Sequence, residues 1–135
     1  MKERVTFRVR YAETDQMGRA YHAWYLVWLE MGRTSFMRRL GLPYGEMEKR
    51  GFYLPVRSVE VRYHRPLHYD EEVTVETWLA RVGRARLVFG SLVLAEDGRR
   101  AAEGTVELAV CDADGKPRRL PADLHDLLKR CEHAG

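Results

Sequence analysis

The sequence predicts an α+β protein in which one antiparallel sheet of about five strands wraps around one long central helix, with a short C-terminal helix. Residues 5–11 alternate between apolar and polar side chains, residues 23–40 carry a long apolar stripe at helical spacing, and four extended runs follow between residues 58 and 115. Strands joined by short turns must pair antiparallel. The helix carries more apolar surface than a flat sheet would cover, so we expect the sheet to curve around it.

The first extended run, "VTFRVRY", is typical of a half-buried strand. Val5, Phe7, Val9 and Tyr11 share one face, and the residues between them are threonine and arginine. Strict alternation of this kind places one face against a core.

The run from residue 23 to residue 40 predicts the central helix. Its stripe is widened by two tryptophans and ends before Gly41 and Pro43, which are common helix terminators. Gly32 costs a helix about 1 kcal/mol relative to alanine, so we expect it to allow close approach to another backbone. We expect the helix to be buried on most sides. The stripe consists of Tyr25, Leu29, Gly32, Phe36 and Leu40.

The remaining elements follow from turn signals. Residues 45–55, "GEMEKRGFYLP", are expected to form a loop before the four extended runs. Gly83 marks the turn between the second and third runs, and Asp97-Gly98 predicts a tight hairpin before the fourth. The tail from Leu120 carries leucines at helical spacing with Pro121 near its start, which predicts a short amphipathic helix.

Composition limits the class of protein. The 135 residues fit a single domain over 1–135, and no apolar run approaches the roughly 20 residues needed to span a bilayer. The charged N-terminus and the two cysteines favour a cytoplasmic protein without membrane insertion. Arginine supplies 19 of the 23 basic residues, which suits surface ion pairs or a phosphate-bearing partner. The sequence has no block of basic residues with interleaved aromatic residues, so nucleic-acid binding is not favoured.

Two segments resemble a known protein family. The later of the two segments along the chain reads "VEVRYHRPLHYDEEVTVET" and contains Tyr63, Pro66 and Asp70 in the order that this family has. Together they resemble the 4-hydroxybenzoyl-CoA thioesterase family of hotdog-fold proteins, and within it the bacterial acyl-CoA thioesterase branch associated with the Tol–Pal system. The first segment reads Asp15-x-x-Gly18-x-x-Tyr21-His22-x-x-Tyr25-Leu26-x-x-x-Glu30-x-x-Arg33.

The resemblance implies a thioester hydrolase that acts on acyl-CoA and uses no metal or other cofactor. It assigns a catalytic carboxylate to Asp15 and the carbonyl-activating backbone N–H to His22. The pair Tyr21-His22 matches the acyl-CoA branch rather than the aromatic pair of the hydroxybenzoyl enzyme. The resemblance also implies a homo-oligomer, either a dimer or a dimer of dimers (a homotetramer), with sites between subunits.

The residues themselves permit this chemistry. The first N–H groups of a helix have no intrahelical partner and lie at the positive end of its dipole. Residues 20–23, "AYHA", contain no side chain that commonly caps a helix, so an N–H near His22 is available to a substrate oxygen unless Asp15 folds back onto it. Gly18 permits a turn between them. Asp15 is expected to act as nucleophile or as general base, and the sequence leaves both open.

Other residues have structural interpretations beside functional ones. We expect Gly18, Tyr21, Tyr25, Arg84 and Arg86 to contribute to substrate binding, with Tyr25 as a core or pocket-wall residue and Arg57, Arg62 and Arg65 as further candidates for the CoA phosphates. Glu30 and Arg33 lie three apart on one helix face, which predicts a structural ion pair. His64 and His68 flank Pro66 in extended chain, so no metal site is expected.

Three alternatives to an acyl-CoA thioesterase stay open. The first is a thioesterase for acyl groups on acyl carrier protein, whose acidic surface a basic protein would attract. The second is dehydration of a hydroxyacyl thioester on the same fold, although the motif differs from the dehydratase arrangement. The third is a non-catalytic acyl-CoA-binding protein, against which the presence of Asp15 argues.

Overall fold

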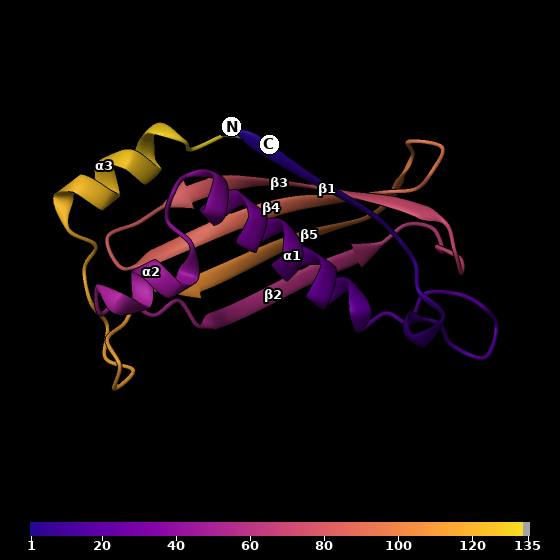
Figure 1. The fold of residues 1–135 in the computed structure, drawn as a ribbon, viewed down its shortest axis with the longest axis horizontal. Helices are drawn as coiled ribbons and strands as arrows, with labels where there is room; N and C mark the ends of the chain where they lie inside the picture. Colours follow the sequence, from indigo (N-terminus) through magenta and orange to yellow (C-terminus); the bar gives the residue numbers. More distant parts are fainter. Residues whose placement is uncertain (134–135) are drawn as a thin grey trace.

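A single antiparallel sheet lies against one long helix in the computed structural model, which describes residues 1–133 (Figure 1). The strand order in the sheet is β1-β3-β4-β5-β2, and all neighbouring strands pair antiparallel, as the short turns predicted. Helix α1 crosses one face of the sheet (Figure 1). The elements in chain order are β1 (Lys2–Arg8), the 3-10 turn η1 (Tyr11–Glu13), α1 (Trp24–Arg39), α2 (Tyr44–Lys49), β2 (Val56–Tyr63), β3 (Glu72–Val82), β4 (Arg86–Leu94), β5 (Arg100–Ala109) and α3 (Ala122–Arg130).

The core lies between α1 and the face of the sheet that it covers. Trp28, Leu29 and Phe36 from the helix are fully buried, and the ring of Phe36 meets that of Phe89 on β4 edge to face at a centroid distance of 5.4 Å. This arrangement is favourable for aromatic pairs. In β1, β3, β4 and β5 the burial of side chains largely alternates, as the period of a strand predicts, because every second side chain faces the helix.

Gly32 allows the helix to approach β3 closely, although the neighbour differs from the expected one. A Cβ at this position would overlap Oγ1 of Thr77 and lie 3.3 Å from a methyl of Val75. The glycine therefore makes room for side chains of β3 rather than for a neighbouring backbone. The sequence could identify the need for a small residue here but not the group that requires it.

One apolar surface of the molecule stays exposed, so the expectation that α1 is buried on most sides is wrong for this face. We call this surface the apolar flank. Strand β2 lies at an edge of the sheet and pairs only with β5, and no described element lies outside it. The exposed helix residues therefore continue across onto an open strand edge. The apolar flank consists of Leu26, Val27 and Met31 of α1 with Val56 and Val59 of β2.

Two local features differ from the sequence predictions, and the C-terminal helix agrees with them. Tyr11 does not continue β1: the strand ends at Arg8, and Tyr11 lies in η1 with 79% of its surface exposed. The segment expected as a loop contains α2, which is held by the buried side chain of Met47. Helix α3 begins after Pro121 as predicted. No helix within residues 1–133 is long and apolar enough to cross a membrane.

Candidate functional site

Asp15 lies at the start of a tight turn that returns the chain toward α1. Its backbone N–H donates to the carbonyl of Arg19 at 2.8 Å, and Gly18 adopts the positive φ of 74° that the turn requires. The Asp15 Oδ1 accepts the N–H groups of Met17 at 2.8 Å and of Arg19 at 3.1 Å. One carboxylate oxygen is therefore held by the turn, whereas Oδ2 has no hydrogen-bond donor within residues 1–133.

The turn is anchored to the segment before β3. The carbonyl of Gly18 accepts the N–H of Tyr69 at 3.0 Å, and the N–H of Ala20 donates to the carbonyl of Leu67 at 2.8 Å. Asp70 then adopts a positive φ of 65°, which aspartate tolerates better than most residues. The two segments that carry the family resemblance are thus in contact.

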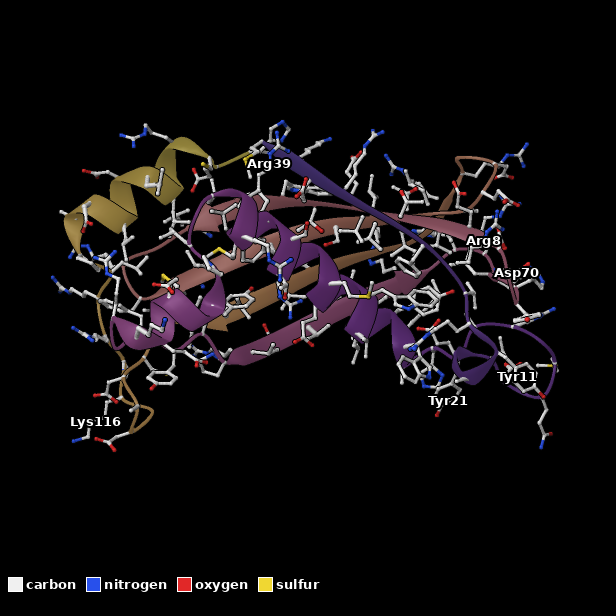
Figure 2. All side chains as sticks on the ribbon, viewed as in Figure 1. Arg8, Tyr11, Tyr21, Arg39, Asp70 and Lys116 are labelled. Atoms are coloured by element: carbon white, nitrogen blue, oxygen red, sulfur yellow. The ribbon has the colours of Figure 1, made fainter. Side chains whose placement is uncertain are left out.

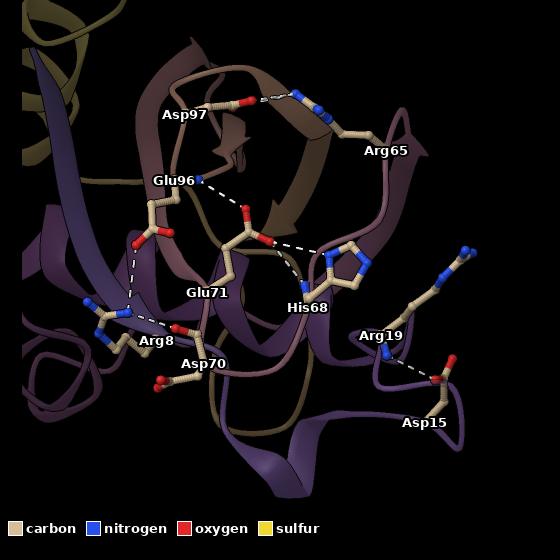
Figure 3. A network of polar contacts seen from close by, with 9 residues as sticks. All are labelled: Arg8, Asp15, Arg19, Arg65, His68, Asp70, Glu71, Glu96 and Asp97. Carbon is tan, nitrogen blue, oxygen red and sulfur yellow. Dashed lines mark hydrogen bonds and ion pairs between the residues drawn. The ribbon is translucent and has the colours of Figure 1, made fainter.

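A polar network fixes this second segment in turn (Figure 3). The carboxylate of Glu71 accepts the N–H of His68 at 3.1 Å and the N–H of Glu96 at 3.2 Å. From β1, the guanidinium of Arg8 donates to the carbonyl of Asp70 at 2.7 Å. The Asp15 turn therefore rests on a support tied to β1 and to the β4–β5 hairpin.

Glu13 fixes the other side of the turn, and the sequence did not identify it. Its side chain is 3% exposed and accepts the indole N–H of Trp28 at 2.9 Å and the backbone N–H of Arg10 at 2.8 Å. Burial acts to raise the pKa of Glu13, but these hydrogen bonds and the charge of Arg10 hold it below its usual value. The Glu13 carbonyl accepts the N–H of Tyr21 at 2.8 Å. This buried carboxylate thus joins the loop to the middle of α1.

The start of α1 has free backbone donors. No side chain caps the helix, as its sequence predicts, and Asp15 caps its own turn instead of the helix. The N–H groups of His22 and Ala23 have no acceptor within the part of the chain that the structure describes. The hydroxyl of Tyr63 donates to the His22 carbonyl at 2.9 Å and so orients this first turn. Sequence spacing could not reveal that contact, which spans 41 residues.

Asp15 and the helix start line the same groove of about 500 Å³. Of the predicted site residues, four line it and Gly18 forms the adjoining turn. The side chain of Tyr25 is buried and forms a wall of this groove. Its burial, and to a smaller extent the nearby Tyr63 and Glu71, raise the pKa of Tyr25 to about 12, so its hydroxyl stays neutral at physiological pH. The groove is lined by Asp15, Met17, Arg19, Ala20, Tyr21, His22, Tyr25, Tyr63, His64, Arg65 and Pro66.

The structure does not bring Arg84 and Arg86 to this groove within one chain. They lie at the turn between β3 and β4, at the opposite end of the sheet from the Asp15 turn (Figure 1). Arg86 pairs there with Glu107 at 2.8 Å. The groove contains two other arginines: Arg65 is paired with Asp97 at 3.1 Å, and Arg19 forms no ion pair with any described residue.

The two histidines around Pro66 have separate acidic neighbours. His64 lies 3.7 Å from a carboxylate oxygen of Glu103, and His68 lies 3.7 Å from one of Glu71. Within residues 1–133, no group of three or more metal-ligating side chains comes together.

A second turn of the same construction allows the role of Asp15 to be separated from its turn. Oδ1 of Asp112 accepts the N–H groups of Asp114 at 2.9 Å and of Lys116 at 3.0 Å, and Gly115 has a φ of 83°. Lys116 lies at the far end of the molecule from Tyr21 (Figure 2). The turn geometry alone therefore indicates no reaction, and what distinguishes Asp15 is the groove and the helix start beside it.

Comparisons with known proteins agree with this geometry. Residues 9–128 match the model of the thioesterase-like superfamily. The chain is 44% identical over 128 residues to the putative acyl-CoA thioesterase YneP of Bacillus subtilis, covering 92% of this chain and 93% of that one. It is 29% identical to the acyl-CoA thioester hydrolase YbgC of Escherichia coli O6:H1, covering 87% and 88%. The solved DHNA-CoA thioesterase of Staphylococcus aureus superposes with a TM-score of 0.90 at 35% identity, covering 96% and 89%. The chain therefore has the hotdog fold and belongs to the thioesterase-like superfamily.

Proposed function

We propose that this protein hydrolyses acyl-CoA thioesters, with Asp15 and the backbone N–H of His22 as the reacting groups. The observation that carries the proposal is that an aspartate with one unengaged carboxylate oxygen and an uncapped helix start line one groove. The relatives named as acyl-CoA thioesterases support the substrate class.

The helix start supplies the electrophilic assistance. The thioester oxygen accepts the His22 N–H, and the positive end of the α1 dipole favours the negative charge that develops on it. Tyr63 keeps the first turn of the helix in place through the His22 carbonyl. Removing a donor of this kind in other enzymes lowers turnover by about 10²–10³.

Asp15 supplies the attack by one of two routes. As a nucleophile, its Oδ2 bonds to the carbonyl carbon, CoA leaves as thiolate, and water then hydrolyses the mixed anhydride to free acid and regenerated aspartate. As a general base, it takes a proton from a water that attacks the carbon directly, the C–S bond breaks, and CoA leaves as thiolate, which takes up the proton. A single turnover in ¹⁸O-water identifies the nucleophilic route if ¹⁸O enters Asp15 and the product acid stays unlabelled, because a general base takes no oxygen from water. Label in the product acid arises from the general-base route and also from opening of the anhydride at the acyl carbon.

Two copies of the chain complete the binding site in this proposal. The apolar flank and the open edge of β2 suit an isologous contact with a second copy. Antiparallel pairing of the two β2 edges reverses the partner's sheet, so the β3–β4 turn of one copy comes to the end of the sheet that holds Asp15 in the other. Arg84 and Arg86 would then reach the CoA phosphates from the second copy, beside Arg19 of the first. Two such dimers would form the tetramer.

The finer assignments are proposals on the same grounds. We place the chain near the 4-hydroxybenzoyl-CoA thioesterase family, in its Tol–Pal-associated acyl-CoA branch. The Tyr21-His22 pair and the similarity to YbgC support this placement. We also treat residues 1–135 as one thioesterase domain of a cytoplasmic protein.

Release of free thiol from a panel of acyl-CoAs and acyl carrier protein thioesters tests the function. We expect turnover of CoA thioesters by the unmodified protein. Turnover of carrier-protein thioesters alone would show that the substrate is an acyl carrier protein thioester rather than an acyl-CoA. Thiol release from neither substrate class would favour a non-catalytic acyl-CoA-binding protein.

A further inference from the structure

Arg33 is a buried cation without an ion-pair partner among residues 1–133. Its side chain lies on α1 and is 6% exposed, and its Nε is fully enclosed without a hydrogen-bond acceptor. The ion pair expected with Glu30 is absent, since no carboxylate among residues 1–133 lies within ion-pair distance of Arg33. An enclosed donor without an acceptor is unfavourable, so the Nε of Arg33 is open to an acceptor from outside the chain.

Tyr44 presents a second unpaired polar atom beside it. Its hydroxyl is buried without a hydrogen-bond partner within residues 1–133. Burial raises the pKa of Tyr44 above its usual value, while the nearby positive charge of Arg33 acts in the opposite direction. A donor cation and a hydroxyl that can donate or accept therefore lie side by side in one place.

Both residues line one cavity of about 370 Å³ between α1, α2 and β2. Apart from these two, its walls are apolar side chains and the carboxylates of Glu30 and Glu48. Arg33 and Glu30 also line a neighbouring cavity of about 210 Å³, which extends along α1 to Leu26 beside the apolar flank, so the second copy of the proposed dimer would form its outer wall. Leu26 directly follows Tyr25, which lines the Asp15 groove. The two cavities at Arg33 thus form a course beside α1 that extends back to Leu26, which lies four residues after His22.

The distance and the charges define the ligand. Eleven residues separate His22 from Arg33, which is about 16 Å along a helix, and helical side chains lean back toward the N-terminus. An aliphatic acyl chain of about ten carbons therefore spans the interval. The carboxylates of Glu30 and Glu48 would repel a further carboxylate, whereas an uncharged oxygen satisfies Arg33 without repulsion.

We propose that the cavity at Arg33 and Tyr44 is a specificity subsite for acyl groups that carry an uncharged oxygen, a hydroxyl or keto group, at the end remote from the thioester. This inference rests on the proposed function, since it places the thioester at Asp15 and His22. Arg33 donates to the remote oxygen, and Tyr44 completes the contact.

Thiol release from matched substrates tests the subsite. The substrates are ω-hydroxydecanoyl-CoA, decanoyl-CoA, and β-hydroxydecanoyl-CoA, whose hydroxyl lies too close to the thioester to reach Arg33. We expect kcat/KM for the ω-hydroxy substrate to exceed that for the other two by about tenfold or more, as for a buried hydrogen bond to a charged group. Equal values for all three would overturn the proposal, as would a preference for an ω-carboxyl chain.

Variants assign the preference to its residues. Arg33→Met and Tyr44→Phe should each reduce the ω-hydroxy preference, and Arg33→Met should improve decanoyl-CoA turnover relative to the hydroxylated substrate. Arg38→Met, an exposed arginine on the same helix, is the control and should leave the ratio unchanged. Tyr44→Phe removes a single oxygen, so it tests the subsite even if Arg33→Met fails to fold. A ratio unaffected in Tyr44→Phe and in folded Arg33→Met contradicts the inference.

Binding separates this inference from the proposed function. Calorimetric titration of Asp15→Asn with the same CoA thioesters reads the subsite without turnover. Absence of hydrolysis by the unmodified protein together with tighter binding of the ω-hydroxy compound would refute the proposed function and support the subsite. Equal binding of all three compounds would refute the subsite whatever the turnover.

Discussion

Replacing Glu13 by alanine is expected to destabilise the fold and to disturb the reacting groups together. The change leaves the buried indole N–H of Trp28 and the part-buried backbone N–H of Arg10 without acceptors. An unsatisfied buried donor costs about 1–3 kcal/mol, and the Arg10 donor belongs at the lower end of that range. The free energy of unfolding should therefore fall by roughly 2–4 kcal/mol. Thioester turnover should fall as well, because the same residue holds the loop between Asp15 and α1.

Urea unfolding followed by far-ultraviolet circular dichroism measures the stability change. Glu60→Ala is the matched control, since its carboxylate belongs to an exposed ion pair and should change stability by less than about 0.5 kcal/mol. A double-mutant cycle of Glu13→Ala with Trp28→Phe should show a coupling energy of about 1 kcal/mol or more. A Glu13→Ala protein as stable as the Glu60→Ala control, or zero coupling with Trp28, would refute this account of the loop.

Three further predictions follow from single contacts. Gly32→Ala should destabilise the protein by about 1–3 kcal/mol through overpacking, and adding Thr77→Ala should recover part of the loss in urea unfolding; an unchanged midpoint in Gly32→Ala would contradict the close approach. Tyr63→Phe should lower kcat severalfold with little change in unfolding, because it frees the carbonyl of His22 without emptying the core, and unchanged kinetics would remove its positioning role. Burial acts to raise the pKa of Glu76, but hydrogen bonds from two basic side chains of β1 hold it below its usual value. The stability that the Glu76 carboxylate contributes to the fold is therefore complete at neutral pH and is lost as the pH falls through the folded-state pKa. Glu76→Gln should flatten the acid side of a stability-against-pH curve, and a curve identical to that of the unmodified protein would contradict this.

The sequence predicted the sheet and the central helix because each has one buried face, which imposes a period on the residues. Helix α2 was not predicted, because only Met47 of its six residues is buried and one buried residue produces no periodic pattern. Tyr11 kept the alternation of β1 although the chain had already turned toward the Glu13 contacts. The apolar flank looked like core for a related reason: an exposed Val27 reads the same in sequence as one packed inside the chain.

At the site, the turn was predictable and its supports were not. An aspartate followed by Gly18 carries its own turn signal, and the absence of a cap before α1 can be read from four residues. Glu13 and Tyr63 act through partners 15 and 41 residues away, and such contacts leave no local pattern. Arg33 shows the converse: its spacing from Glu30 predicted an ion pair, but Arg33 is buried in the course beside the helix while Glu30 stays exposed.

The most direct test of the central claim compares Asp15→Asn with Asp112→Asn in single-turnover thiol release from an acyl-CoA. Both changes are near-isosteric and both alter the same kind of turn, but only Asp15 lies beside the uncapped helix start. We predict that Asp15→Asn abolishes release while still binding the substrate, and that Asp112→Asn retains the full rate. Full release by Asp15→Asn, or an equal loss in both variants, would contradict the assignment of hydrolysis to the Asp15 carboxylate.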